Sequence, residues 1–252
     1  MKRSILLIAL VLNVSLGLAQ DSINMELKTI ELSHGRLAFN STSILHRSTI
    51  SSTLQMNETN LGIQLHHLQL NQESEQTIGI NTTLSGQRTS HQLSIAGGGD
   101  VLAPKFQLGY FSTTKRSDSL SFLAGANLIF LSDQTIGLGQ QVGWIRTAKT
   151  HTQIIRIFNS SNKEQYLAPN LLLAYLKEFN SKTLLQLHAV GGYTPQNDPL
   201  LKSQTQIGSG AWLRQSLGSQ LQMNLSVSYN HAFEGISTSQ ARLSLVYKIK
   251  NQ

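Results

Sequence analysis

The stretch QLQMNLSVSY, residues 220–229, alternates polar and apolar side chains without interruption. Because the side chains of a β-strand point alternately to its two faces, this pattern predicts a strand with one oily face and one polar face. Two interpretations fit such a strand. A soluble β-sandwich would bury the oily face in a core, whereas an outer-membrane barrel would turn that face to lipid and enclose the polar one.

The polar faces favour the barrel. The last predicted strand, ARLSLVYKI at 241–249, carries Arg242 and Lys248 on one face, and burying such cations in a dry core would cost several kcal/mol each. A watery lumen accommodates them without this penalty. Only 13% of the residues are charged, and Gln, Asn, Ser and Thr supply the remaining polarity. A secreted soluble β-sandwich that binds a ligand and exposes this face to solvent is the alternative.

The chain contains fourteen candidate strands, most of them near the roughly 9 to 11 residues that a tilted strand needs to cross a membrane. After the first twenty residues the longest apolar run is Leu171 to Leu176, which is too short for a membrane-spanning helix. The sequence therefore predicts an all-β fold, a transmembrane antiparallel up-and-down β-barrel of about fourteen strands, with twelve possible. The clearer candidates are 120–131, 135–147, 184–193, 205–217, 220–231 and 241–249, and the weaker ones are 36–45, 49–56, 61–70, 76–84, 91–97, 105–112, 152–158 and 166–176.

Turn lengths support the same fold, because bacterial barrels have short periplasmic turns and longer external loops. Counting back from a last strand that ends in the periplasm, the connections 231–240 and 194–203 fall outside and are long. The connections Gly218-Ser219 and 180–183 fall on the periplasmic side and are short. Residues 132–134 should be external but are short, so the expected parity holds best in the C-terminal third.

The N-terminus predicts export and a location in the bacterial outer membrane. Lys2 and Arg3 precede a mostly apolar stretch that ends in small residues, the pattern of a cleaved signal peptide over 1–19. Residues 20–35 are then an N-terminal extension or first strand, and 36–252 the barrel. The chain has no cysteine, hence no disulfide or thiolate metal site, and its net charge of +7 is scattered, which argues against nucleic acid.

A resemblance to a known family rests on GGGDVLAPKFQLGY at 97–110, with Asp100, Pro104 and Lys105 in its loop, and on PNLLLAYLKEF at 169–179 and GGYTPQNDP at 191–199. In the order and spacing of these pieces, from about Arg36 onward, the chain resembles the YaiO family of outer-membrane β-barrels. The resemblance implies an integral outer-membrane protein with outer-membrane lipid and the assembly machinery as partners, in some members associated with surface polysaccharide. It implies no particular biochemical activity.

Catalytic and metal sites have weak support in the sequence. Ser228, His231 and Glu234 would suit an outer-membrane lipid-modifying hydrolase, yet a spacing of three places Ser228 and His231 on opposite faces of a strand. His66 and His67 are adjacent and therefore also diverge, so they cannot simply share one metal ion. We predict no cofactor and no metal, and favour a protein that is not an enzyme.

The lumen is the candidate site. Basic and amide side chains share the polar faces of the last strands, and basic groups inside a narrow passage favour anions. We therefore expect a conduit or docking element for envelope material, such as an anionic solute or surface polysaccharide. The candidate lumen-lining residues are Arg214, Trp212, Arg242, Lys248, Gln186, His188, Gln222 and Asn224.

Overall fold

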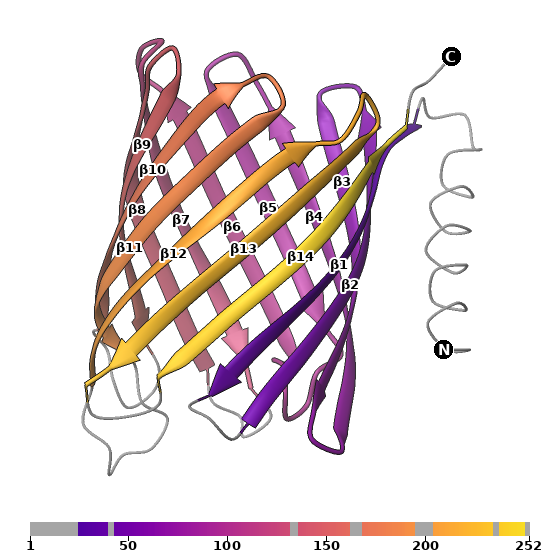
Figure 1. Ribbon diagram of the computed structural model, residues 1–252, viewed down its shortest axis with the longest axis vertical. Coiled ribbons are helices and arrows are strands. Elements are labelled where there is room, and N and C mark those ends of the chain that lie inside the picture. The colour runs from indigo at the N-terminus through magenta and orange to yellow at the C-terminus, as the bar shows by residue number, and fades with distance from the viewer. Residues whose placement is uncertain are drawn as a thin grey trace.

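The computed structural model describes residues 25–39, 43–131, 136–161, 168–194, 204–233 and 237–249. Within them fourteen antiparallel strands form one closed barrel, in which each strand pairs with its neighbours in the chain and β1 pairs with β14 (Figure 1). None of the described segments is a helix long and apolar enough to span a membrane. The strands are β1 Met25–Phe39, β2 Ser43–Met56, β3 Thr59–Leu70, β4 Glu73–Ser85, β5 Thr89–Gly97, β6 Phe106–Lys115, β7 Leu120–Phe130, β8 Ile136–Thr147, β9 His151–Ser161, β10 Pro169–Asn180, β11 Thr183–Thr194, β12 Gln204–Ser216, β13 Leu221–Ala232 and β14 Thr238–Lys248.

The predicted fold class and strand number are confirmed, and the soluble sandwich is excluded by the closure of the barrel. One boundary is wrong. The candidate strand at 36–45 covers the end of β1 and the start of β2, and β1 begins at Met25, within the stretch 20–35 predicted as an N-terminal extension or first strand. The signal peptide predicted over 1–19 lies outside the described residues.

The outer face of the barrel is apolar. The register places Leu225 of β13 between Leu213 of β12 and Leu243 of β14, all on one face. Leu221, Leu225, Leu243 and Leu245 are 38–46% exposed, so no second layer covers them. Since exposed apolar side chains in such a continuous band are stable only against lipid, this face meets the membrane and the chain lies in the bacterial outer membrane.

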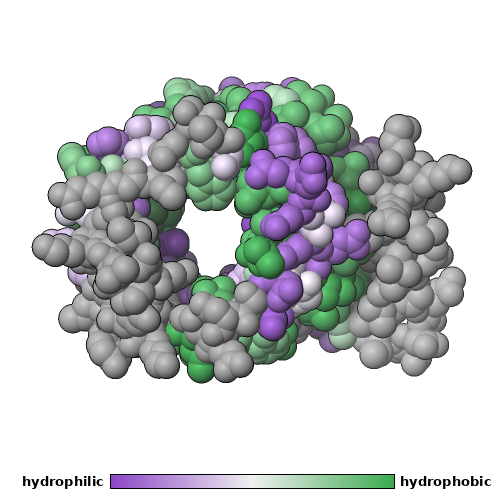
Figure 2. Space-filling view, turned by 90° about the horizontal axis from the view of Figure 1, so that it is seen from below, coloured by the Kyte–Doolittle hydropathy of each residue, from purple (hydrophilic) through white to green (hydrophobic). Residues whose placement is uncertain are grey.

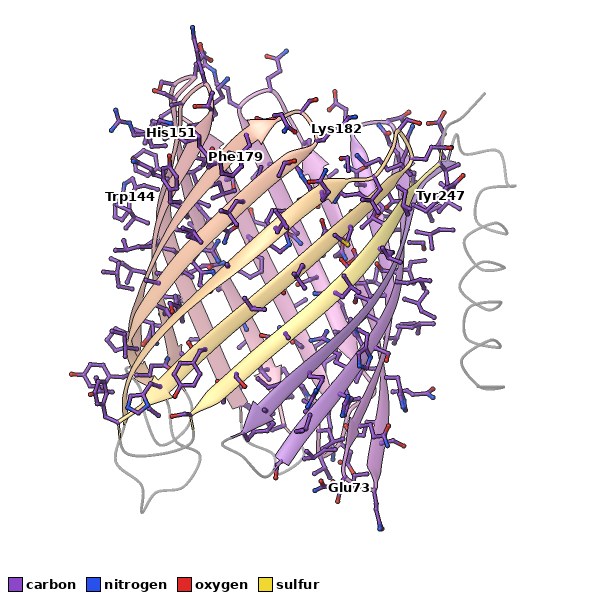
Figure 3. The ribbon with its side chains drawn as sticks, viewed as in Figure 1. Glu73, Trp144, His151, Phe179, Lys182 and Tyr247 are labelled. Carbon is purple, nitrogen blue, oxygen red and sulfur yellow. The ribbon has the colours of Figure 1, made fainter. Side chains whose placement is uncertain are left out.

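Aromatic side chains mark the two borders of the apolar band, although only 6% of the residues are aromatic. Near the short turns Phe122 packs edge-on against Trp144, and Tyr247 lies close to the end of β14 (Figure 3). Near the opposite end Phe106 packs against Phe130, with ring centroids 5.8 Å apart. These positions correspond to the interfacial girdles of outer-membrane barrels.

The two ends of the barrel differ in the length of their connections. At the end drawn upward in Figure 1 the strands are joined by two to four residues, and at the other end by two to nine. We assign the end with longer loops to the exterior. Two hairpins have two-residue turns whose first residues, Asn57 and Asn71, take the left-handed φ values of 52° and 54° that such turns need.

Candidate functional site

The inward rows of side chains are identified by residues that meet across the barrel. Gln64 of β3 and Trp212 of β12 line one cavity together with Asn224 and Arg242. Five strand-to-strand steps separate β3 from β12 around the barrel, so these residues can share a cavity only across the lumen. Because alternate residues share a face, the inward row of every other strand follows from the register.

All eight lumen-lining candidates lie on inward rows in this register. Asn224 Nδ2 donates to Ser244 Oγ at 3.1 Å, and Gln222 Nε2 donates to Asn224 Oδ1 at 2.9 Å. His188 leans over Gly210, and its Nδ1 is buried without a hydrogen-bond partner among the described residues. The interior wall of β11 to β14 is therefore polar, and several of its side chains are already held by one another.

The cations of the lumen are distributed unevenly. Arg214 and Lys248 lie near the short turns, where Glu26 and Glu178 also occupy inward rows and offset their charge. Farther toward the exterior the balance changes. There the inward rows hold Arg47, Arg156 and Arg242 against two carboxylates, Glu31, which pairs with Arg242 at 3.2 Å, and Glu75 near the rim. The excess of positive charge thus lies in the middle and outer parts of the lumen.

Arg47 and Arg242 flank a glycine. In the register Gly35 of β1 lies opposite Arg242 of β14 on one side and opposite Arg47 of β2 on the other. A Cβ atom at Gly35 would come within 3.3 Å of Arg242 Cβ. Arg242 thus packs closely against the backbone of β1 at Gly35, and Gly35, Arg47 and Arg242 line the same cavity.

The two arginines are held by different partners. Arg242 Nη2 donates to Glu31 Oε1 at 3.2 Å and to Ser33 Oγ at 3.0 Å. Arg47 Nη2 lies 3.2 Å from both ring nitrogens of His66. Because a guanidinium can only donate, His66 accepts from it as a neutral ring. No carboxylate lies within 4.0 Å of Arg47 among the described residues, so its charge is unpaired.

The connection between β5 and β6, residues 98–105, faces these arginines. The carboxylate of Glu75 accepts hydrogen bonds from the backbone N–H groups of four successive residues, 100 to 103, three of them at 2.9 to 3.1 Å. Gly98 has a φ of +99°, which is a left-handed conformation that favours glycine and lets the chain turn inward from the end of β5. This connection is therefore a fixed part of the wall.

Glu75 lies beyond the apolar band, since its outward neighbours Ser74 and Gln76 are polar and the apolar row of β4 starts at Ile78. Desolvation alone would raise its pKa, but the four N–H groups outweigh it and hold the pKa of Glu75 below its ordinary value. The carboxylate is therefore charged at neutral pH and keeps the connection in place.

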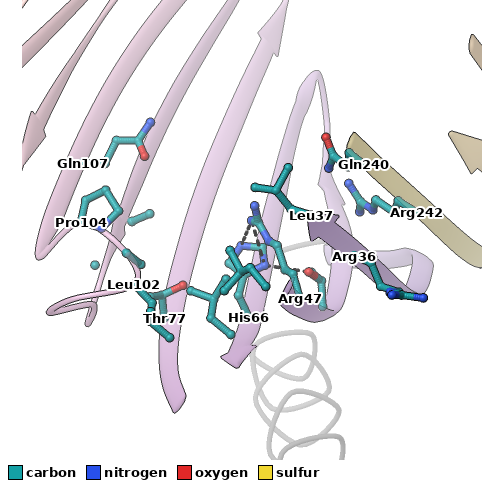
Figure 4. Close-up of a pocket in the computed structure, with 17 residues that line it drawn as sticks. Arg36, Leu37, Arg47, His66, Thr77, Leu102, Pro104, Gln107, Gln240 and Arg242 are labelled. Atoms are coloured by element: carbon teal, nitrogen blue, oxygen red, sulfur yellow. Dashed lines mark hydrogen bonds between the residues drawn. The ribbon is translucent and has the colours of Figure 1, made fainter. Parts of the chain in front are cut away.

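A cavity of about 280 Å³ lies between the arginines and this connection (Figure 4). Its polar lining includes Thr77, Gln107 and Gln240. Its apolar lining consists of Leu37, Leu45, Leu68, Leu102, Ala96, Ala103 and Pro104. Seen from the end with the longer loops, an opening is visible through the middle of the barrel (Figure 2). The cavity is thus a recess at the external mouth of a water-accessible lumen.

The residues of the resembling motif help to build this mouth. Pro104 lines the cavity, Asp100 donates its backbone N–H to Glu75, and the Lys105 ammonium lies 3.7 Å from an oxygen of Asp100. Sequence patterns did not identify Arg47, Gly35 or Glu75 as site residues. The sequence offers one signal for Arg47, which is a basic residue that shares its strand face with Leu45 and Thr49.

The catalytic hypothesis finds little geometric support. Ser228 lies on the inward row of β13 and His231 on the outward row, as their spacing predicts. His231 Nδ1 instead lies 3.1 Å from Ser237 Oγ. Glu234 lies outside the described residues. His66 faces the lumen and His67 faces outward, and the described residues contain no group of three side chains suited to a metal ion.

The fold and its polar lumen define the class, which is the bacterial outer-membrane β-barrel. No family model matches the chain, and no curated protein matches its sequence. The fold is similar to that of a bacterial polysaccharide outer membrane secretin, with a TM-score of 0.59 and 6% identity, over 91% of this chain and 100% of that one. It is also similar to the CymD monoaromatic hydrocarbon channel, with a TM-score of 0.57 and 8% identity, over 90% of this chain and 89% of that one.

A third similar structure is the KdgM porin in complex with disordered oligogalacturonate, with a TM-score of 0.51 and 9% identity, over 88% of this chain and 99% of that one. Identities this low establish the fold alone. The names of the three proteins refer to a polysaccharide, a hydrocarbon and an oligogalacturonate, so the shared fold does not determine the cargo. The cargo has to be argued from the lumen of this chain.

Proposed function

We propose that this protein is a passive conduit through the outer membrane for hydrophilic, negatively charged solutes such as acidic saccharides. The observation that carries the proposal is the cluster of arginines in the middle and outer lumen, where the two carboxylates Glu31 and Glu75 are opposed to Arg47, Arg156 and Arg242. Basic side chains in a narrow aqueous passage attract anions and raise their local concentration. Two of the three similar structures are of proteins whose names refer to saccharides, which supports a saccharide as cargo.

The amide-rich wall fits the same cargo. Gln186, Gln222 and Asn224 offer donors and acceptors to sugar hydroxyls, and Trp212 offers an aromatic face on which a sugar ring can stack. Membership of the YaiO family is part of this proposal, as are outer-membrane lipid and the assembly machinery as partners. The interior residues then determine selectivity, while the outward residues only hold the barrel in lipid.

Planar-bilayer recording of the purified protein tests this function. We expect stepwise conductance and, in a potassium chloride gradient, a reversal potential that shows preference for chloride. The variant Arg156→Glu should shift that potential toward potassium, whereas Arg146→Glu, on the outward row of β8, should leave it unchanged because its side chain does not face the pore. A protein that inserts but remains electrically silent would refute the conduit.

A lipid-directed hydrolase is the second candidate, favoured by the contact of 3.1 Å between His231 Nδ1 and Ser237 Oγ. A serine hydroxyl within hydrogen-bond distance of a histidine is the first requirement of nucleophilic acyl transfer. Incubation of the protein in phospholipid vesicles followed by mass spectrometry of the lipids tests it. Release of fatty acid that the His231→Ala variant abolishes would support the hydrolase, and no release by the unaltered protein would dismiss it.

A further inference from the structure

We propose that the cavity between Arg47, Arg242 and the β5–β6 connection is a binding site for the carboxylate of an acidic sugar. This inference rests on the proposed conduit and identifies the place where its cargo first binds. The structure brings Arg47 and Arg242 to the lining of one cavity, from strands that lie two positions apart around the barrel and flank Gly35 in the register. A carboxylate that enters this cavity can accept hydrogen bonds from both guanidinium groups.

The charges at the site favour an added anion. Arg242 has one carboxylate partner, Glu31, and Arg47 has none among the described residues. The recess is lined by Arg36, Arg47 and Arg242, and Glu31 and Glu75 are the carboxylates beside it, so one net positive charge remains. Arg47 is also kept from folding away, because it rests against His66, whose Nδ1 lies 2.8 Å from Thr49 Oγ1. The donors are therefore in place before a ligand arrives, which lowers the entropic cost of binding.

The remainder of the cavity fits a sugar better than an inorganic anion. Leucine and proline side chains form one part of its lining, and Gln107, Gln240 and Thr77 form another (Figure 4). A pyranose ring presents C–H groups on its faces and hydroxyls around its edge, so it can contact both kinds of surface at once. Chloride or phosphate would leave the apolar part of the lining in contact with water. The volume of about 280 Å³ is close to the lower limit of about 300 Å³ for ligand pockets, which suits a single sugar unit.

The wall opposite the arginines is fixed by Glu75. Because this carboxylate accepts four backbone N–H groups from the β5–β6 connection, it also occupies the donors that would otherwise attract an anion there. The arginine pair is thus the anion-binding element of the recess, and the connection contributes Leu102 and Pro104 as a surface for the ring. An acidic saccharide that reaches the external mouth would bind here by one of its carboxylates.

The test is titration of the full-length protein in detergent with galacturonic acid, galactose, galactose 6-phosphate and benzoate by calorimetry, with current noise in planar bilayers as a second measurement. We expect galacturonic acid to bind, galactose to bind at least tenfold more weakly, and Arg47→Gln to weaken galacturonic acid about tenfold, which corresponds to about 1.4 kcal/mol. Gly35→Leu keeps both charges but adds a bulky side chain to the lining of the cavity, and it should abolish binding. Arg146→Gln, on the outward row of β8 and outside the cavity, is the control and should bind as the unaltered protein does.

The outcomes separate the site from the conduit. Binding that Arg47→Gln and Gly35→Leu leave intact would overturn the site even if the protein conducts. Binding that these variants remove, in a protein that shows no conductance, would establish the site and refute the conduit. Equal affinity for galactose 6-phosphate would mean that charge alone is recognised, and equal affinity for benzoate would mean that the hydroxyl contacts are absent. Either result would refute an acidic-sugar site.

Discussion

A cation placed on the outward row of β13 should destabilise the barrel, whereas the same cation on its inward row should not. Leu225 lies four residues from Leu221, whose register partner is Tyr247, and four residues from Tyr229 on the other side. It therefore lies midway between the two aromatic borders, close to the bilayer midplane. Leu225→Arg places a cation on the lipid face at that depth, which costs about 2–4 kcal/mol. Since about 1.4 kcal/mol corresponds to a tenfold change, the folding equilibrium constant should fall by a factor of roughly 30 to 700.

The matched control is Ser228→Arg, three residues farther along the same strand. Ser228 faces the lumen, where water can hydrate the added guanidinium, so we expect a change within about 0.5 kcal/mol. Urea titration of the protein in lipid vesicles, followed by the fluorescence of Trp144 and Trp212, measures both variants. A loss of stability in Ser228→Arg that equals or exceeds that in Leu225→Arg would refute the assignment of the two faces.

Three further predictions concern the mouth, the packing of the lumen and the resistance of the barrel. Glu75→Gln should loosen the β5–β6 connection and increase current noise. In the unaltered protein the connection should stay fixed above the ordinary carboxyl pKa of 4.5 and loosen as the pH falls through the lowered pKa of Glu75. Current recordings across this pH range measure the effect. Gly125→Ala should destabilise the barrel by about 1–3 kcal/mol in the urea titration, because its Cβ would lie 2.2 Å from Phe111 Cδ1, whereas Gly218→Ala, with no atom within 4 Å, should be nearly neutral. In a denaturing gel the unboiled protein should migrate differently from the boiled one, and identical migration would contradict a detergent-resistant barrel.

The sequence predicted the strands best where alternation is strict. For β7, β8, β11, β12 and β13 the predicted and observed ends agree within one residue, because each strand has lipid on one side and water on the other. At β1 and β2 the rule is harder to apply. His34 and Arg36 of β1 and His46 of β2 occupy outward rows near the external end, where lipid gives way to polar surroundings, so the outward face there is no longer apolar. The boundary between these strands was missed for that reason.

The site was only partly predictable. Alternation alone placed Arg242 on the lumen side, since this property depends on one strand. The pairing of Arg242 with Arg47 across Gly35 depends on the register of three strands, two of which are joined only when the barrel closes. No local pattern encodes it. The role of Glu75 likewise depends on a connection more than twenty residues away, whose backbone donors become visible only when its path is known.

The pairing of β1 with β14 places the beginning and the end of the barrel sequence side by side at the same rim, where Ile249 N donates to Lys28 O at 2.9 Å. A short linker could therefore join these two strands, and new termini could be opened at the Gly218-Ser219 hairpin on the same rim. Such a circular permutant would keep every strand neighbour of the original. The closed barrel therefore does not depend on which strand comes first in the chain, because the set of strand neighbours stays the same.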